Sequence, residues 1–434
     1  KLGGVPIPCI TMLTVKDIAY RVEHSQAVAV ITIAEQCSKF KDHLPALKAK
    51  LVVDGSMTGW AAHDITRQCA EDFDACDLGL EEPAIMYYTS GSTGDPKGVC
   101  HPGRSLYAWR LSARHWLSLG PDDTMWCTAD TGWSKAGTSI LFGPWSQGSA
   151  VLFYDGPFEA RRRFELIERY GVTVFCAAAT ELRRLIHEDI SGIDISALKL
   201  TVSAGESVNP EILDAWQVLT GVPLLDGYGQ TETVNIVANY PGMEIRPGSM
   251  GKPVPGIDIG IIDDDGNVVA DDIVGHIAVK ITDPYPPGLF DGYFRDPEAT
   301  AKSFRNGWYY TGDTATRDGD GYIWFVGRSD DIISSSGYRI SPFEVESALV
   351  EHPGVMESAV VAKADEMRGE IVKAFVVLSG GYEASDDLVV EIQDFVKNLT
   401  APYKYPREIE FREALPKTIS GKIRRVELRA EADG

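Results

Sequence analysis

One short segment of the chain reads Tyr88-Thr89-Ser90-Gly91-Ser92-Thr93-Gly94-Asp95-Pro96-Lys97-Gly98-Val99. It follows an apolar, aromatic stretch at 84–88 that predicts a strand. Glycines let backbone N–H groups approach an anion closely, hydroxyls donate hydrogen bonds, and lysine adds a positive charge. The segment therefore predicts a polyphosphate-binding loop, with a flexible linker of the same composition as the alternative. It is not a Walker A loop, because Lys97 is followed by glycine rather than by serine or threonine.

The overall composition predicts an ordinary globular protein of two or more domains. The chain has 434 residues, of which 44% are hydrophobic and 24% charged, so wholesale disorder is excluded. It carries 41 basic and 63 acidic residues, which give a net charge of −22. A protein this acidic is a poor partner for nucleic acid or for an anionic membrane surface. Any phosphate site must therefore depend on a few local positive groups.

The cysteines and histidines indicate neither disulfides nor a metal centre. Seven cysteines are scattered without C-x-x-C spacing, which predicts reduced thiols and a cytoplasmic protein. The histidines show no metal-ligand spacing, and His101 is interpreted as a loop residue. No apolar run approaches the roughly 20 residues that a membrane-spanning helix needs, so we expect no stable membrane insertion. The first residue is Lys1 rather than methionine, which leaves a preceding targeting signal open.

Predicted strands and helices alternate from about residue 149 onward. Gly171 after the first helix, and Asn209 with Pro210 before the third, are typical helix-boundary residues. Repeated strand–helix units predict a mainly parallel sheet covered by helices, with ligands at the carboxyl ends of its strands. The predicted strands are 150–154, 172–176, 198–202 and 223–225, and the predicted helices are 158–170, 180–189 and one beginning at Pro210. Upstream, a short helix at 15–22 and a buried strand at 28–33 are expected.

The pattern changes twice toward the C-terminus. After about 245, short strands separated by Asp/Gly turns (256–262, 275–282 and 322–326) predict antiparallel β-structure. After Asp330, Ser341 with Glu344 forms a capping box that opens a helix reaching about 351. Strands at 358–363 and 371–378 and a helix at 386–399, with Leu388, Ile392, Phe395 and Leu399 on one face, complete a small α+β unit. The predicted fold is α/β: a large domain 1–330, including a β subdomain 245–330, and a smaller hinged domain 331–434.

Four further segments carry residues suited to nucleotide chemistry. Two of them follow predicted strands, where the ligands of parallel sheets bind. The segments are Ser203-Ala204-Gly205-Glu206, Asp226-Gly227-Tyr228-Gly229-Gln230-Thr231-Glu232, Trp308-Tyr309-Tyr310-Thr311-Gly312-Asp313 with 327–330 and 336–339 behind it, and Pro416-Lys417-Thr418-Ile419-Ser420-Gly421-Lys422-Ile423-Arg424.

In this order and spacing, the five motifs resemble those of AMP-forming acyl-CoA synthetases. These enzymes belong to the adenylate-forming superfamily, which also contains luciferases and peptide-synthetase adenylation domains. The resemblance covers essentially all of residues 1–430, but family members usually carry a further N-terminal part ahead of the point matching Lys1. The most similar group is the medium-chain acyl-CoA synthetases, through Asp130-Thr131-Gly132-Trp133, Ser341-Pro342-Phe343-Glu344-Val345-Glu346 and Ala401-Pro402-Tyr403-Lys404-Tyr405-Pro406.

The resemblance implies that ATP binds across these motifs. The loop residues expected at its β- and γ-phosphates are Thr89, Ser90, Gly91, Ser92, Thr93, Gly94 and Lys97. The other nucleotide contacts are expected from Gly205, Glu206, Asp226, Gly227, Tyr228, Gln230, Asp313, Arg328 and Arg339. Within this set, Tyr228 lies against the base, Asp226 lies near its amino edge, and Asp313 accepts hydrogen bonds from the ribose.

Three residues are expected to act at the reacting atoms. Thr231 touches the α-phosphate, and Glu232 holds Mg²⁺, a hard cation that prefers carboxylate and phosphate oxygens. Lys422 reaches the α-phosphate and the substrate carboxylate, where its charge offsets the negative charge that accumulates as one anion attacks another. The acid's carboxylate then attacks the α-phosphorus and forms acyl-AMP with release of pyrophosphate.

The second half of the implied reaction uses CoA as the acyl acceptor. The small domain turns about Asp330, withdraws Lys422, and presents Ser336 and Gly337 as a narrow channel for the pantetheine arm. The expected acyl pocket is formed by Trp133, Ser134, Lys135 and Gly229.

The resemblance implies that Gly229 occupies the position at which acetate-specific relatives close the pocket with a bulky tryptophan. Because glycine leaves more room, a medium-chain, branched or aromatic acid is predicted. Lys135 either pairs with a polar substrate group or makes a structural salt bridge. Trp133 is interpreted mainly as a packing residue.

The site residues also have plainer interpretations. Lys422 can be a solvated cation in a basic segment, and Asp226 and Glu232 can cap a helix that follows a strand. Asp313 and Arg328 can form a structural ion pair. At the level of the whole protein, the alternatives are an enzyme that loads a carrier protein and a catalytically weak nucleotide-binding remnant. The oligomeric state is not indicated by any pattern in the sequence.

Overall fold

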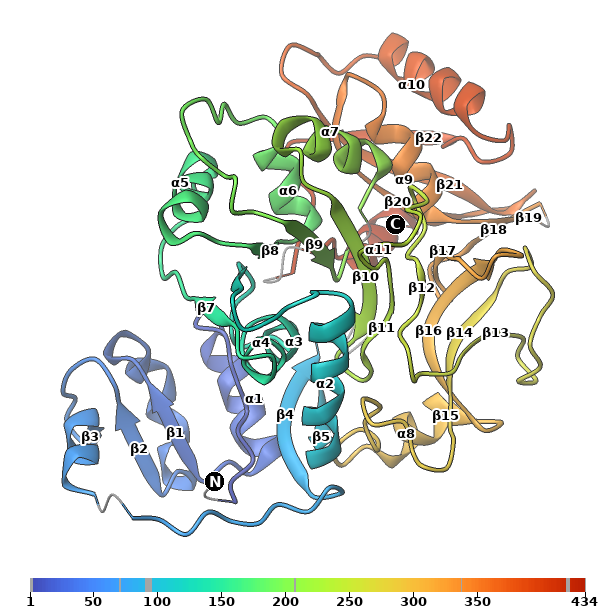
Figure 1. Cartoon of the computed structure of the whole chain (residues 1–434). Coiled ribbons are helices and arrows are strands. Elements are labelled where there is room, and N and C mark those ends of the chain that lie inside the picture. The colour runs from blue at the N-terminus through green and yellow to red at the C-terminus, as the bar shows by residue number, and fades with distance from the viewer. Residues whose placement is uncertain are drawn as a thin grey trace.

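The computed structural model describes residues 3–69, 72–89, 96–206, 208–336, 338–418 and 422–433 (Figure 1). Among the side chains of these ranges, those of 41–46 and of Arg339 are not described. The described residues include no helix that combines the length and the apolar character needed to cross a bilayer.

The first part of the chain forms a helix on a small parallel sheet. Thr14 accepts a hydrogen bond from the backbone of Asp17 and so caps the expected helix. The expected strand also forms, but it is not buried, since Val28 and Ile31 are 54% and 68% exposed. Only one face of the sheet packs on the helix, so alternate residues of the strand face solvent. The elements are α1 (Val15–Ser25), β1 (Ala29–Thr32), η1 (Ala34–Ala46), β2 (Ala49–Val52), β3 (Ala61–Ala62) and η2 (His63–Gln68).

A seven-stranded sheet in the order β12-β11-β10-β9-β8-β6-β7 forms the centre of the molecule (Figure 1). Its strands from β7 to β10 are parallel, as the alternating pattern predicted, whereas β11 and β12 run antiparallel. The strands are β6 (Thr124–Cys127), β7 (Ala150–Leu152), β8 (Val174–Cys176), β9 (Leu200–Ala204), β10 (Leu224–Gln230), β11 (Val234–Ala238) and β12 (Lys252–Pro253).

Three helices alternate with these strands and bury an aromatic core. Phe164, Phe175 and Trp216 stack in the largest cluster of buried side chains. Gly171 ends the first helix in the left-handed conformation, as expected, but Asn209 makes no side-chain cap bond. The helices are α5 (Ala160–Tyr170), α6 (Ala179–Leu185) and α7 (Pro210–Thr220).

A hairpin and three helices lie beside this sheet. The hairpin pairs the apolar stretch before the glycine-rich loop with the segment that begins at Lys97. Trp109 stacks on Phe142 with ring centroids 4.9 Å apart, and this contact joins two of the helices. The elements are β4 (Pro83–Thr89), β5 (Lys97–Pro102), α2 (Gly103–His115), α3 (Lys135–Ser139) and α4 (Phe142–Ser146).

The predicted antiparallel region is a five-stranded sheet, and its longest strand was missed. The segment that begins at Trp308 was read as a binding motif, yet it forms the strand that pairs with three others. Gly312, with φ of +77°, interrupts the alternation that marks a strand in the sequence. The elements are β13 (Ile259–Ile262), β14 (Gly275–Lys280), α8 (Pro297–Ser303), β15 (Phe304–Arg305), β16 (Trp308–Arg317) and β17 (Ile323–Arg328).

The C-terminal part packs helices on a second five-stranded sheet. Ser341 caps its first helix by accepting a hydrogen bond from the backbone of Glu344, as expected. On the helix at 386–399, the buried face carries Val396 rather than Leu399, which is 48% exposed. The elements are β18 (Ile333–Ser335), β19 (Tyr338–Ile340), α9 (Pro342–Val350), β20 (Val355–Asp365), β21 (Gly369–Leu378), α10 (Asp386–Leu399), β22 (Glu408–Arg412) and α11 (Arg425–Asp433). The domain boundary near Asp330 stays a prediction.

Candidate active site

A cavity of about 1760 Å³ brings most of the predicted site residues together. It is lined by the central sheet, the antiparallel sheet and the C-terminal segment. The predicted residues on its wall are Thr89, Lys97, Trp133, Ser134, Lys135, Gly205, Glu206, Asp226, Gly227, Tyr228, Gly229, Gln230, Thr231, Glu232, Asp313, Arg328, Asp330 and Lys422.

The remaining predicted residues are not part of that wall. Ser336 does not line the cavity; its hydroxyl accepts a hydrogen bond from Arg368. Residues 90–94, Gly337 and the side chain of Arg339 lie outside the described residues.

The motif that begins at Asp226 lies on a strand, not in a loop after one. Strand β10 continues to Gln230 and turns back into β11, so no helix follows, and the interpretation of Asp226 and Glu232 as helix caps is wrong. Glycines allow close packing along this strand. A Cβ at Gly227 would meet the ring of Trp116.

Gly229 lies very close to the backbone of the neighbouring strand. A Cβ built there would overlap the carbonyl oxygen of Val234 on the neighbouring strand. The prediction that Gly229 leaves room for a longer acyl group stays a prediction, and the close backbone is a second reason for a glycine here. Although Gly229 lines the cavity, any side chain at this position must first displace the β10–β11 hairpin.

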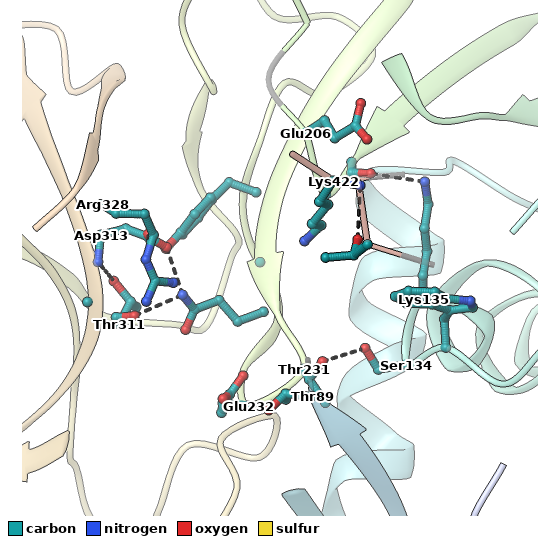
Figure 2. Close-up of a pocket in the computed structure, with 18 of the residues that line it drawn as sticks. Thr89, Ser134, Lys135, Glu206, Thr231, Glu232, Thr311, Asp313, Arg328 and Lys422 are labelled. Atoms are coloured by element: carbon teal, nitrogen blue, oxygen red, sulfur yellow. Dashed lines mark hydrogen bonds and ion pairs between the residues drawn. The ribbon is translucent and has the colours of Figure 1, made fainter. Parts of the chain in front are cut away.

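A buried carboxylate, that of Asp313, is held by two neutral donors. Tyr228 donates a hydrogen bond of 2.6 Å to its Oδ2, and the Gln230 amide donates one of 2.7 Å to the same oxygen. The Arg328 Nε lies 3.6 Å from Oδ1 and 3.6 Å from the Asp330 carboxylate (Figure 2). The expected Asp313–Arg328 ion pair thus exists, but it is longer than the hydrogen bonds that orient the carboxylate. Burial raises the pKa of Asp313, and Arg328 partly opposes this shift.

The next two residues along the chain from Gln230 face the floor of the cavity. The hydroxyls of Ser134 and Thr231 share a hydrogen bond of 3.0 Å, which links α3 to the β10–β11 turn. Glu232 accepts a hydrogen bond of 2.9 Å from Tyr293 through Oε1, and its own backbone N–H also donates to the carboxylate. Burial raises the pKa of Glu232. The described residues contain no group of three or more metal-ligating side chains, so a cation here would depend on Glu232 and on oxygens brought by a substrate.

The described end of the glycine-rich loop lies beside the same carboxylate. The Lys97 ammonium lies 4.7 Å from the centre of the Tyr293 ring, whose hydroxyl binds Glu232. Lys97 and Glu232 are therefore both neighbours of Tyr293, an arrangement that can hold phosphates and a cation together.

The ammonium of Lys135 lies on the opposite side of the cavity, near Glu206 (Figure 2). It donates a hydrogen bond of 3.1 Å to the Ala204 carbonyl and pairs with no carboxylate of the described chain, so the expected structural salt bridge is wrong. Desolvation acts to lower the pKa of Lys135, but the neighbouring Cys176 and Cys127 raise it overall. This lysine therefore stays charged against the cavity wall.

The side chain of Lys422 projects into the cavity between these two sides (Figure 2). Its loop is held by a bridge between Lys417 and Ile423, and its backbone N–H donates to the Thr418 hydroxyl at 3.1 Å. Lys422 is near enough to Asp313 to contribute to lowering the pKa of that carboxyl. The residue is also exposed to solvent, as the solvated-cation interpretation predicts, so its role at the reacting atoms stays a prediction.

His101 was interpreted as a loop residue, and this is wrong. It is fully buried on β5, and its Nε2 lies 2.5 Å from the Thr231 carbonyl oxygen. A carbonyl can only accept, so Nε2 carries the proton and donates. Burial lowers the pKa of His101 to about 4, which keeps the ring neutral. The available signal in the sequence was the apolar Val99, two residues earlier. Residues i and i+2 of a strand lie on the same face, so a buried Val99 predicts a buried His101.

A cavity built in this way suits an adenylate-forming enzyme. A carboxylate such as that of Asp313 can accept hydrogen bonds from a sugar, and a cation such as that of Lys422 can bind a phosphate, so the cavity holds groups suited to both parts of a nucleotide. Models of protein families agree with this class. Residues 1–294 match the AMP-binding enzyme family, and residues 344–422 match the AMP-binding enzyme C-terminal domain.

The individual relatives indicate which kind of AMP-binding enzyme the chain resembles. The mitochondrial acyl-coenzyme A synthetase ACSM3 of Mus musculus is 46% identical over 438 residues, which cover 99% of this chain and 76% of that protein. The uncharacterized acyl-CoA ligase YtcI of Bacillus subtilis (strain 168) is 45% identical over 432 residues, 99% of this chain and 81% of YtcI. The crystal structure of the anthranilate CoA ligase AuaEII with anthranoyl-AMP superimposes with a TM-score of 0.89 at 33% identity, covering 100% of this chain and 83% of that one. The chain therefore belongs to the AMP-binding enzyme family, among its acyl-CoA synthetases.

The prediction of a cytoplasmic protein is contradicted by these relatives. ACSM3 and ACSM4, which are 42–46% identical to this chain, are named as mitochondrial proteins. All seven cysteines are free, as expected. Free thiols report a reducing environment, but they do not distinguish one reducing compartment from another.

Proposed function

We propose that this synthetase activates a medium-chain, branched or aromatic carboxylic acid as acyl-AMP and transfers the acyl group to CoA. AMP and pyrophosphate are the other products. The observation that carries this proposal is the meeting of Lys422, Thr231 and Asp313 around one cavity, although they come from three different parts of the chain. This arrangement supports a nucleotide bound by its sugar, with a cation at its α-phosphate.

In the first step the chain's own groups orient two anions against each other. Asp313 accepts hydrogen bonds from the ribose hydroxyls, and Thr231, which shares a hydrogen bond with Ser134, donates to the α-phosphate. Lys422 binds the α-phosphate and the attacking carboxylate together and neutralises the charge that develops. His101 donates to the Thr231 carbonyl and so holds the turn in which Thr231 lies. Positioning and charge neutralisation supply the catalysis.

Glu232 fits the role of a Mg²⁺ ligand. Its carboxylate lies at the cavity wall, where Tyr293 binds one of its oxygens. Mg²⁺ accepts few protein ligands when phosphates supply the rest, so one carboxylate suffices. When bound, the cation would neutralise phosphate charge, and Glu232 and Lys97 would hold that charge near Tyr293.

For the second step we propose a turn of the C-terminal domain about Asp330. In the described orientation Lys422 faces the nucleotide region, whereas Ser336 lies off the cavity wall. The CoA channel at Ser336 and Gly337 therefore requires a different orientation of the domain. The names of the curated relatives and of the anthranilate CoA ligase support CoA as the acceptor rather than a carrier protein.

Pyrophosphate exchange with a panel of straight-chain, branched and aromatic acids tests this function. Acid-dependent exchange, followed by AMP release on addition of CoA, is the expected result. Exchange that never responds to CoA would support carrier loading instead. A protein that exchanges with no acid would contradict the proposal.

A further inference from the structure

An unpaired amide lies on the wall of the proposed acyl pocket. Asn235 on β11 is only 6% exposed, and neither its amide nitrogen nor its oxygen has a hydrogen-bond partner in the described part of the protein. The same side chain lines the cavity. A buried amide without partners destabilises the fold, so its presence at a binding wall indicates that a ligand group completes it.

The backbone around Asn235 is constrained toward the same cavity. Val234, immediately before it, has φ of +57°, which is strained for a β-branched residue. Asn235 pairs with Gly229 across the hairpin, and Gly229 lies two residues before Thr231 in the chain. That separation corresponds to about 7 Å of strand, so a group bound at Asn235 lies several bonds from the carboxylate that reacts beside Thr231.

Two further polar groups reach this wall from other elements. Trp116, after α2, is 1% exposed, lines the cavity, and has an indole N–H with no hydrogen-bond partner among the described groups. Lys135 opens α3, which packs against β11. Three elements therefore contribute N–H groups to the cavity wall, and a few polar groups of this kind orient the ligand of a small-molecule pocket.

These groups define the chemistry of their partner. Asn235, Trp116 and Lys135 all supply N–H donors, and the only acceptor among them is the Asn235 carbonyl. A surplus of donors recognises an oxygen atom. The positive charge of Lys135 is already opposed by Cys176 and Glu206, which favour its charged form, so the oxygen need not be anionic.

We propose that Asn235, Trp116 and Lys135 form a subsite for a hydroxyl or carbonyl oxygen on the acyl group, so that the enzyme prefers oxygenated acids to unsubstituted acids of equal size. This inference rests on the proposed acyl-CoA synthetase function and names its substrate class. An unsubstituted chain leaves the Asn235 amide and the Trp116 indole N–H unpaired and desolvated, and gives Lys135 no partner beyond the Ala204 carbonyl. A site of this kind discriminates more strongly than an apolar pocket.

The test compares matched acids in pyrophosphate exchange. Hexanoate is measured against hydroxyhexanoates and oxohexanoates, and benzoate against hydroxybenzoates. We expect kcat/KM for the best oxygenated member of a pair to exceed that of its parent by about tenfold or more, as befits a hydrogen bond to a buried group. In Asn235→Leu this ratio falls by about tenfold, and exchange with the unsubstituted parent increases because no amide is left unpaired.

Tryptophan variants supply a second measurement, in which test and control lose the same buried volume. Trp116→Phe removes the N–H donor, keeps an aromatic ring beside Gly227, and should also lower the ratio. Trp109→Phe is the matched control: its indole N–H is likewise buried and unpaired, but it lies off the cavity wall, so the ratio should not change.

The outcomes distinguish failure of the proposed subsite from failure of the proposed synthetase function. Exchange that is equally efficient with parent and oxygenated acids, or variants that affect all acids alike, would overturn the subsite and assign these groups to bound water. An absence of exchange with every acid would instead refute the proposed function, and the subsite with it.

Discussion

The two sides of the cavity differ in how their polar side chains are satisfied. On the side that we propose binds the nucleotide, Asp313 receives hydrogen bonds from Tyr228 and Gln230, so it is oriented before any ligand arrives. On the acyl side, Asn235 and the Trp116 indole N–H lie buried without partners among the described residues. A preorganised side binds the same ligand every time, whereas an unsatisfied side depends on the chemistry of the acid. Four substitutions test this difference between the two sides of the cavity.

The largest effect is expected from Lys422→Ala, which removes the cation between the two sides. Adenylation should fall by about 10²–10³-fold, the usual loss for one group that stabilises developing charge. Conversion of supplied acyl-AMP to the thioester should persist, because Lys422 leaves the site before that step in our proposal. Half-reactions are measured by pyrophosphate exchange and by thioester formation.

Lys417→Ala is the matched control in the same loop. Lys417 pairs with Glu357 at 2.7 Å and lies outside the cavity, so its loss should affect neither half-reaction strongly. Equal loss of both half-reactions in Lys422→Ala would contradict its assignment to adenylation.

A pH-dependent effect is expected at His101, beneath the nucleotide side. Its pKa is about 4 in the folded protein, against 6.5 ordinarily. Between these values the unfolded chain binds a proton that the folded protein does not, so the free energy of unfolding falls as pH drops from 6.5 to 4. The loss attributable to His101 should reach about 3 kcal/mol.

His101→Gln, which keeps a donor for the Thr231 carbonyl but cannot titrate, isolates this contribution. Urea unfolding of the unmodified protein and of His101→Gln between pH 4 and 6.5 gives the difference in their free energies of unfolding. Contributions from other titrating groups are shared by the two proteins and cancel in this difference. Among these is Asp226, whose pKa burial raises to about 7 and whose slope has the opposite sign. Parallel curves for the two proteins would mean that the pKa of His101 is the same in the folded and unfolded states, which would contradict the lowered pKa.

Replacing Asp313 by alanine tests the preorganised side directly. Loss of charged hydrogen bonds to the ribose should weaken ATP binding by about 2 kcal/mol, seen as a raised KM for ATP with the acid preference unchanged. The control is Asp271→Ala, which removes an exposed ion pair to Arg317 near the other end of β16 and should cost under about 1 kcal/mol of stability. A changed acid preference in Asp313→Ala would show that the two sides are not separate.

The smallest effect is expected from Gly229→Ala, where the two sides meet. The added methyl group overlaps the Val234 carbonyl, so the hairpin must shift at a cost of about 1–3 kcal/mol in the free energy of unfolding. Exchange should fall with all acids rather than favour short ones. Gly319→Ala, where a Cβ meets no atom within 4 Å, is the control. A clean shift toward acetate would support the simple pocket interpretation of Gly229.

Local sequence patterns predicted most of the elements of the fold. The alternation of apolar runs and helix-boundary residues identified the parallel sheet and its helices, because these signals act over a few residues. Motif spacing likewise predicted which residues meet in the cavity, from Asp226 to Lys422. Boundaries failed where a strand carries glycines, as at Gly312 and Gly229, because glycine hides the two-residue alternation.

Burial and partners were decided only by the tertiary structure. His101 and Asn235 are ordinary polar residues in the sequence, and their roles come from segments up to 130 residues away, such as the Thr231 carbonyl above His101. Conversely, β1 reads as a buried strand but presents Ile31 to solvent. The chain's own sequence therefore determined where most strands and helices occur, through short-range propensity, and its motifs predicted the nucleotide-binding residues. Which polar groups are paired and which await a ligand depends on long-range packing, which no local pattern encodes.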